Sequence, residues 1–313
     1  MTRSGLLRWG RILIALSILY FLIKHLLGLL TTLEGEVVVF KPFWLLAAFT
    51  SLLLYFVLLG IPWLFLYRAG REKPVPLLSG WTFFQLSQLG RYLPGRVGQV
   101  VWMLSFSRGF GIEKTSAVLA TCLQLAFQCS LGCLFGCLIL WHTETAQLLQ
   151  NVLASLEMSV KTGLICIGIG TLGGGVVFLY RDRIQETFSR LIEQGAAMFS
   201  MSTLLLSLGV YLLLWGLLGT AFFLFIKSLC PISVSQLLVV TGIYAVAWSI
   251  GFLSVITPSG LGVREGVLSL LLTTVLPPAT ATLVALLARL WTLAAELLLG
   301  GVAFGIYFRQ RRV

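Results

Sequence analysis

Six charged side chains lie inside or beside the long apolar stretches of this 313-residue chain: Arg91, Arg96, Arg264, Glu265, Arg289 and Glu296. A charge within a membrane span costs roughly a few kcal/mol or more, so each of them marks a candidate functional site. Arginine stays charged, and its planar guanidinium matches the geometry of phosphate oxygens. The four arginines therefore predict a binding site for an anionic lipid head group. The alternative is that they only pair with the two carboxylates and hold the helices together.

The stretch 254–271, SVITPSGLGVREGVLSLL, interrupts the apolar pattern just before Arg264. Pro258 cannot donate a backbone hydrogen bond, and Gly260 and Gly262 loosen the backbone. Irregular backbone survives at membrane depth only where protein buries it or where it lines a wet cavity. We therefore expect a helix to begin just after Gly262, with its free N–H groups and the guanidinium of Arg264 directed at the same anion.

Two runs, TPSGLGVREGVLSLLL and the upstream GRYLPGRVGQVVWML (90–104), resemble the lysylphosphatidylglycerol synthase transmembrane, or flippase-like, family. In that family a Pro-x-Gly-Gly-Leu-Gly-x-Arg-Glu-Gly pattern opens a late helix, and Ser259 stands here where a glycine is common. The resemblance spans residues 10–308 and implies a protein that moves a lipid or a lipid-linked sugar between leaflets. It does not extend to the soluble aminoacyl-transfer domain of the bifunctional members, so we do not expect lipid aminoacylation.

The composition indicates one polytopic membrane domain over residues 1–313. Hydrophobic residues make up 58% and charged residues 11% of the chain, with a mean hydropathy of +0.99, whereas soluble domains carry about 25% charged residues. We therefore predict an all-α helix bundle. The net charge of +11 suits cytoplasmic loops and anionic lipids better than nucleic acid, because no basic domain stands apart from the apolar runs.

Six apolar runs are long enough to cross a bilayer as helices. They are 11–30, 43–66, 116–140, 161–180, 203–226 and 279–307. Between them lie two regions, 79–110 and 235–277, which are apolar but interrupted by proline, glycine and arginine. The prediction is therefore about six full spans plus two segments of broken helix.

Positive charge is distributed unevenly between the two sides that six full spans would define. One side carries Arg3, Arg8, Arg11, Arg68, Arg71, Lys73, Arg108, Lys114, Arg181, Arg183, Arg190, Arg309, Arg311 and Arg312. The other side carries only Lys24, Lys41, Lys161 and Lys227. Because lysine and arginine favour the cytoplasmic side, we predict a multi-pass protein of the cytoplasmic (inner) membrane with both termini in the cytoplasm and the loop 141–160 outside.

This topology makes each interrupted region a re-entrant or broken-helix hairpin, and the two enter from opposite faces. Their turns match in spacing, Pro94 to Gly98 and Pro258 to Gly262, with an arginine close to each turn. Paired interrupted segments in two halves of a chain are a pointer to a transporter site formed by an inverted repeat. Chance is the alternative, since proline and glycine are common in membrane helices.

Uncharged polar side chains accompany both regions. They are Gln85, Ser87, Gln88, Tyr92 and Gln99 in the first, and Tyr244, Ser249, Ser254, Thr257 and Ser259 in the second. Gln124 and Gln128, on the run 116–140, are candidates for the same interior. These groups either line a wet cavity and contact the head group of a lipid, or only bridge helices.

Two classes of function follow. The first is a lipid translocator for an anionic phospholipid or a polyprenyl-phosphate-linked sugar, which binds through the six charged residues together with Pro94, Gly98, Gln99, Pro258, Gly260 and Gly262. The second is an integral-membrane transferase, or an accessory subunit of a glycosyltransferase or lipid-modifying enzyme. We expect no enzyme activity, cofactor or metal, because the chain has no Walker A sequence, no paired Asp motif and no metal-ligand spacing.

Overall fold

The computed structural model describes residues 40–69, 75–92, 98–141, 200–253 and 262–310, together with the short pieces 144–145 and 147–148. Within these residues every regular element is helical, with eight α-helices and several short 3-10 segments. This confirms the predicted all-α class.

Five helices in the described part of the chain are long and apolar enough to cross a membrane, judged by length and composition. They are α2 (Pro42–Arg68), α5 (Lys114–Gly136) with the start of η3 (Cys137–Trp141), α9 (Met201–Leu229), α10 (Leu237–Leu253) with the preceding η5 (Val234–Gln236), and α12 (Pro278–Gln310). Their lengths of 19 to 33 residues compare with the roughly 20 residues that the hydrocarbon core requires.

Four of these helices coincide with predicted spans, whereas α10 differs from the prediction. The runs 43–66, 116–140, 203–226 and 279–307 fall on α2, α5, α9 and α12. The runs 11–30 and 161–180 lie outside the described residues. The prediction counted all of 235–277 as one interrupted hairpin, but α10 is a continuous apolar helix, because the proline and charges that interrupt this region all come after it.

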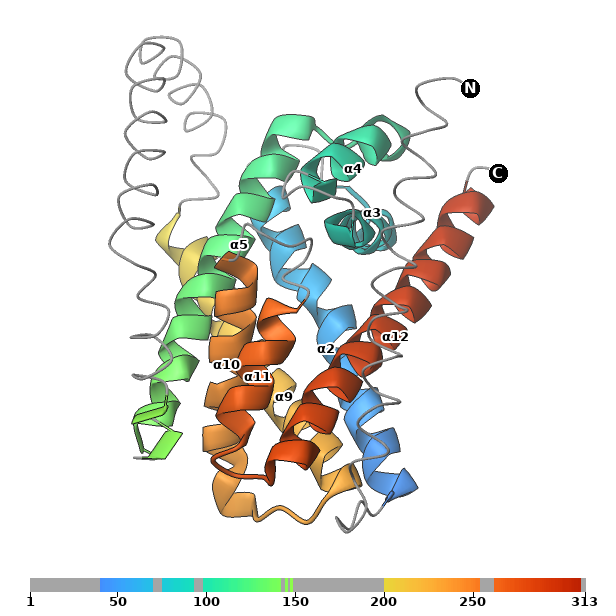
Figure 1. The fold of residues 1–313 in the computed structure, drawn as a ribbon. Helices are drawn as coiled ribbons and strands as arrows, with labels where there is room; N and C mark the ends of the chain where they lie inside the picture. The colour runs from blue at the N-terminus through green and yellow to red at the C-terminus, as the bar shows by residue number, and fades with distance from the viewer. Residues whose placement is uncertain are drawn as a thin grey trace, which may run out of the picture.

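Helices from the two interrupted regions lie toward opposite ends of the bundle (Figure 1). The first region forms α3 (Leu77–Leu89), η1 (Gly90–Tyr92) and α4 (Gly98–Ser107), near the end of the bundle where α12 ends. The second forms α10 and α11 (Val263–Leu272), which pack side by side and both reach the other end of the bundle. From there α12 runs back past both regions and packs on α3 as well as α11.

Two hydrogen bonds from α3 fix its position on α2, which runs uninterrupted from Pro42 to Arg68. Trp81 Nε1 donates to the carbonyl of Val57 at 3.0 Å, and Gln85 Nε2 donates to the carbonyl of Phe56 at 2.7 Å. These bonds hold α3 across α2. The next element, η1, follows α3 directly and contacts α12 through Arg91 and Tyr92, which both meet Glu296.

Candidate functional site

The helix α11 begins where the sequence predicts a break. Gly262 has a φ of 84°, a left-handed conformation that favours glycine, and α11 starts at the next residue. The backbone N–H of Gly262 donates to Oε2 of Glu265 at 2.7 Å. The N-terminus of α11 is therefore capped by its own carboxylate, which satisfies one of the free N–H groups that the sequence assigned to an anion.

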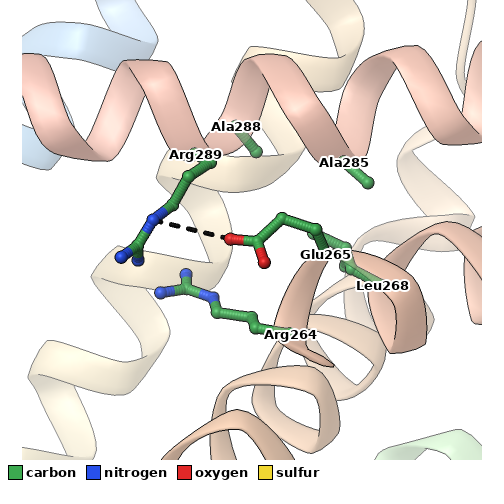
Figure 2. Close-up of a pocket in the computed structure, with 6 residues that line it drawn as sticks. All are labelled: Arg264, Glu265, Leu268, Ala285, Ala288 and Arg289. Carbon is green, nitrogen blue, oxygen red and sulfur yellow. Dashed lines mark ion pairs between the residues drawn. The ribbon is translucent and has the colours of Figure 1, made fainter. Parts of the chain in front are cut away.

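The second oxygen of Glu265 faces a charge on α12. Arg289 Nε lies 3.5 Å from Glu265 Oε1, and only 6% and 7% of the two side chains are exposed. The separation exceeds a normal hydrogen bond, so the pair is a charge contact with loose geometry. Figure 2 shows this pair in a pocket that Arg264 also lines. The guanidinium groups of Arg264 and Arg289 lie on the same side of the pocket, near the carboxylate of Glu265.

A second ion pair lies further along α12. Arg91, in η1, places Nη2 3.4 Å from Glu296 Oε1. The hydroxyl of Tyr92 donates to the other oxygen, Oε2, of Glu296. The side chain of Arg91 is 27% exposed and that of Glu296 is 10% exposed, so this pair is more open than the first.

Arg264 differs from the other two arginines because its partner is neutral. Its Nη2 donates to the hydroxyl of Tyr244 on α10, and its guanidinium carbon lies 4.7 Å from the centre of the same ring. Among the described residues it contacts no carboxylate. A methyl group at Gly251 would come within 2.7 Å of Arg264 Cβ, so a glycine on α10 permits the close approach of α11 that sets this contact.

The two ion pairs and Arg264 form one cluster, which we call the charged cluster. The guanidinium of Arg289 lies 5.8 Å from the ring centre of Tyr92, and this contact joins the first pair to the second. Tyr55, on α2, is within electrostatic range of Arg91, Arg264, Glu296 and Tyr244. Arg289 and Glu296 are about 10 Å apart along the axis of α12, since each residue of a helix rises about 1.5 Å.

The charged cluster carries an excess of positive charge in an enclosed space. It contains three arginines and two carboxylates among the described residues. The pocket between Arg264, Glu265 and Arg289 is so tightly lined that it leaves no room for a water-sized sphere. Ligand sites for small molecules span roughly 300–1,000 Å³, so this pocket would have to widen before it could accept a lipid head group.

The structure brings together five of the predicted site residues: Arg91, Arg264, Glu265, Arg289 and Glu296. Gly262 caps the helix that carries two of them, and Gly98 and Gln99 form the first turn of α4. The predictions for Pro94, Arg96, Pro258 and Gly260 concern residues outside the described part of the chain.

Tyr55 is a further candidate that was not predicted from the sequence. It is 7% exposed and lies within electrostatic range of Arg91, Arg264 and Glu296. Its signal was a phenol within the long apolar run 43–66. Tyr92 and Tyr244 were noted only as polar neighbours, whereas the structure makes them direct hydrogen-bond partners of Glu296 and Arg264.

A helical bundle with several apolar spans, and with buried ion pairs between short helices and one long span, defines a multi-pass membrane protein. Residues 8–300 match the family model described as "Lysylphosphatidylglycerol synthase TM region", and the chain belongs to this family. No curated protein matches the chain, and no solved structure does.

Proposed function

We propose that this protein translocates a lipid with an anionic head group, either a phospholipid or a polyprenyl-phosphate-linked sugar, across the cytoplasmic membrane. The observation that carries this proposal is the unbalanced charge of the cluster, in which Arg264 has a phenol rather than a carboxylate as its partner. Arg264 is only partly exposed, and a cation without a counter-ion at membrane depth is costly. A lipid phosphate would supply that counter-ion, and arginine can bind it through two parallel hydrogen bonds.

The arrangement along α12 supports movement of a head group rather than static binding. Each ion pair has one member on α12, Arg289 or Glu296, and these two residues lie at different positions along the helix. The second member of each pair comes from a different interrupted region. Both pairs have N–O separations longer than a hydrogen bond. A phosphate at Arg264 would compete with Glu265 for Arg289, and after passing Tyr92 it would compete with Glu296 for Arg91.

The proposal includes an inverted repeat of two hairpins that enter from opposite sides, with both termini in the cytoplasm. Its support is that α3 and α4 lie near one end of the bundle while α10 and α11 reach the other end (Figure 1). Single cysteines at positions 96 and 262, in a cysteine-free protein, test this arrangement with an impermeant thiol reagent. We expect labelling from opposite sides of the membrane, and labelling of both from one side would refute the repeat.

The function itself is tested by reconstituting the purified protein in liposomes with fluorescent anionic lipids and measuring their movement between leaflets. We expect Arg264→Ala to abolish movement and Arg264→Lys to recover part of it, because lysine keeps the charge but loses the planar fork. Arg108→Ala is the matched control, since Arg108 is exposed in η2 (Arg108–Phe110) at the end of the bundle.

The thermal stability of each variant in detergent separates binding from folding. Normal stability with lost movement supports a role in substrate binding. Lost stability would instead make Arg264 a structural residue, and normal values in both assays would remove it from the site. Chemical change of the lipid during the assay, rather than movement alone, would favour a transferase over a translocator.

A further inference from the structure

A second group of buried polar side chains lies outside the charged cluster, between α5, α9 and α10. Its members are Gln124, Ser207, Tyr211 and Ser249, which we call the neutral layer. Their exposed fractions are 2%, 0%, 1% and 7%. In each side chain one fully buried polar atom has no hydrogen-bond partner: Oε1 of Gln124, the hydroxyl oxygens of Ser207 and Ser249, and the phenol oxygen of Tyr211.

Ring and glycine contacts place these residues where α5, α9 and α10 pack against one another. The ring of Phe127, one turn from Gln124 on α5, stacks on Tyr211 with centroids 5.7 Å apart. A methyl group at Gly132, further along the same helix, would lie 2.6 Å from the hydroxyl oxygen of Ser249 and 3.1 Å from the ring of Trp215. Ser207 is one helical turn before Tyr211 on α9, on the same face.

Packing alone does not account for this chemistry. More than nine-tenths of buried polar groups in folded proteins have a hydrogen-bond partner, because an unpaired one loses its hydration without compensation. Leucine, alanine or phenylalanine at these positions would fill the same space without that loss. Four unpaired groups where these three helices pack together therefore point to a ligand that supplies the missing hydrogen bonds when it is bound.

The neutral layer and the charged cluster share the helices α9 and α10. Tyr244 of the charged cluster packs on Phe222 of α9, with ring centroids 4.4 Å apart, and α9 also carries Ser207 and Tyr211. The helix α10 forms a wall that both regions share, since it carries Tyr244 toward the charged cluster and Ser249 toward α5. If Arg264 binds the phosphate of a ligand, the ligand atoms next to that phosphate lie close to α10.

We propose that the neutral layer binds the hydroxyl groups of a polyol or sugar that is attached to the lipid phosphate. This inference rests on the proposed function and specifies its substrate class. The layer holds amide and hydroxyl groups, and none of its four members is charged, so it suits neutral groups that both donate and accept hydrogen bonds. A site whose buried polar groups need partners rejects an analogue that lacks the hydroxyls.

The inference is tested with two short-chain lipids of equal charge, dioctanoyl phosphatidylglycerol and dioctanoyl phosphatidylpropanol, which differ only in the two hydroxyls of the head group. A ligand that binds the folded state raises the midpoint of thermal unfolding. We expect phosphatidylglycerol to raise the midpoint of the detergent-purified protein more than phosphatidylpropanol does. Equal shifts with the two lipids, or no shift with either, would overturn the inference.

Variants then assign the preference to the neutral layer. Tyr211→Phe and Ser249→Ala each remove one hydroxyl and should bring the two midpoint shifts together. Tyr307→Phe is the matched control, because the ring of Tyr307 stacks on Phe110 near the C-terminal end of α12, and it should leave the difference intact. Retention of the full preference in both neutral-layer variants would refute the assignment.

Transport distinguishes this inference from the proposed function. If the wild-type protein binds phosphatidylglycerol preferentially but moves neither lipid in liposomes, the proposed function fails and the hydroxyl site stands. If it moves both lipids at the same rate and binds them equally, translocation stands and the hydroxyl site fails.

Discussion

The charged cluster and the neutral layer both hold buried polar side chains, but they differ in whether those side chains have partners within the protein. In the charged cluster each carboxylate faces an arginine, and a tyrosine hydroxyl bonds to Glu296 or to Arg264. Arg91 Nη2 and Glu265 Oε1 make no hydrogen bond, but each faces an opposite charge. In the neutral layer, polar atoms of Gln124 and Tyr211 have neither a hydrogen-bond partner nor an opposite charge.

We infer from this difference that the paired residues of the charged cluster stabilise the fold, whereas the unpaired residues of the neutral layer are available to bind a ligand. Removing one member of a paired group exposes the other to an apolar interior, which is destabilising. Removing a group that has no partner relieves a cost that folding had to overcome. The same kind of substitution should thus have opposite effects on stability in the two regions, and the following predictions test that contrast from the largest effect to the smallest.

Glu265→Ala should have the largest effect. It removes both the carboxylate that faces Arg289 and the acceptor for the backbone N–H of Gly262. Loss of one partner from a buried ion pair costs about 3–5 kcal/mol, so we expect a large drop in the free energy of unfolding and in the yield of monodisperse protein. Thermal unfolding in detergent measures the drop. A wild-type midpoint would show that this pair does not stabilise the bundle.

The double variant Glu265→Leu with Arg289→Met separates pairing from packing. Replacing a buried ion pair with apolar residues of similar volume is often neutral or stabilising. We expect the double variant to regain much of the stability that Glu265→Ala loses, while lipid movement stays absent. Stability as low as that of the single variant would indicate that the cap on α11 matters more than the charge pair.

Tyr92→Phe should have an intermediate effect. It removes the hydroxyl that donates to Glu296 and leaves the ring that Arg289 contacts. Hydrogen bonds to charged groups contribute about 1.5–3 kcal/mol, and we expect a loss in this range in equilibrium unfolding. Tyr211→Phe provides the comparison outside the charged cluster, because the hydroxyl of Tyr211 has no hydrogen-bond partner. An equal loss in both variants would show that the bond to Glu296 adds nothing specific.

Gly251→Ala tests the close contact between α10 and α11 that positions Arg264. Its new methyl group would meet Arg264 Cβ at 2.7 Å, so α11 must shift away from α10 and carry the guanidinium away from Tyr244. Overpacking of this kind costs about 1–3 kcal/mol, and we expect slower lipid movement in liposomes. Gly266→Ala, on α11 with open space around it, is the control and should be neutral. Unchanged movement in Gly251→Ala would mean that the position of Arg264 is not critical.

Gln124→Leu should have the smallest effect on stability, and its sign is the informative result. The variant removes an unpaired buried amide oxygen, so we expect the unfolding midpoint to stay the same or to rise. The same substitution at Gln85, whose amide donates to the carbonyl of Phe56, should lower the free energy of unfolding by about 1 kcal/mol and lower the midpoint accordingly. Destabilisation of similar size at both positions would contradict the contrast between the two regions.

Much of the bundle could be predicted from local sequence, because long apolar runs are a direct physical signal for spans. Four predicted runs coincide with described helices. The prediction failed for α10, since proline and charge further along the chain led us to treat an uninterrupted helix as part of a broken one. The start of α11 after Gly262 was predicted correctly, because a left-handed glycine and a helix start are both local properties.

The sequence by itself determined that six charges lie in an apolar setting, and that Arg289 and Glu296 share a face of one helix without reaching each other. Only the tertiary structure decided their partners. Arg289 faces Glu265 of α11, and Glu296 faces Arg91 of η1, because α12 packs on helices from both interrupted regions. Pairing across helices depends on distances between elements far apart in the chain, which no local pattern encodes. For the same reason the unpaired groups of the neutral layer became visible only once three helices were placed side by side.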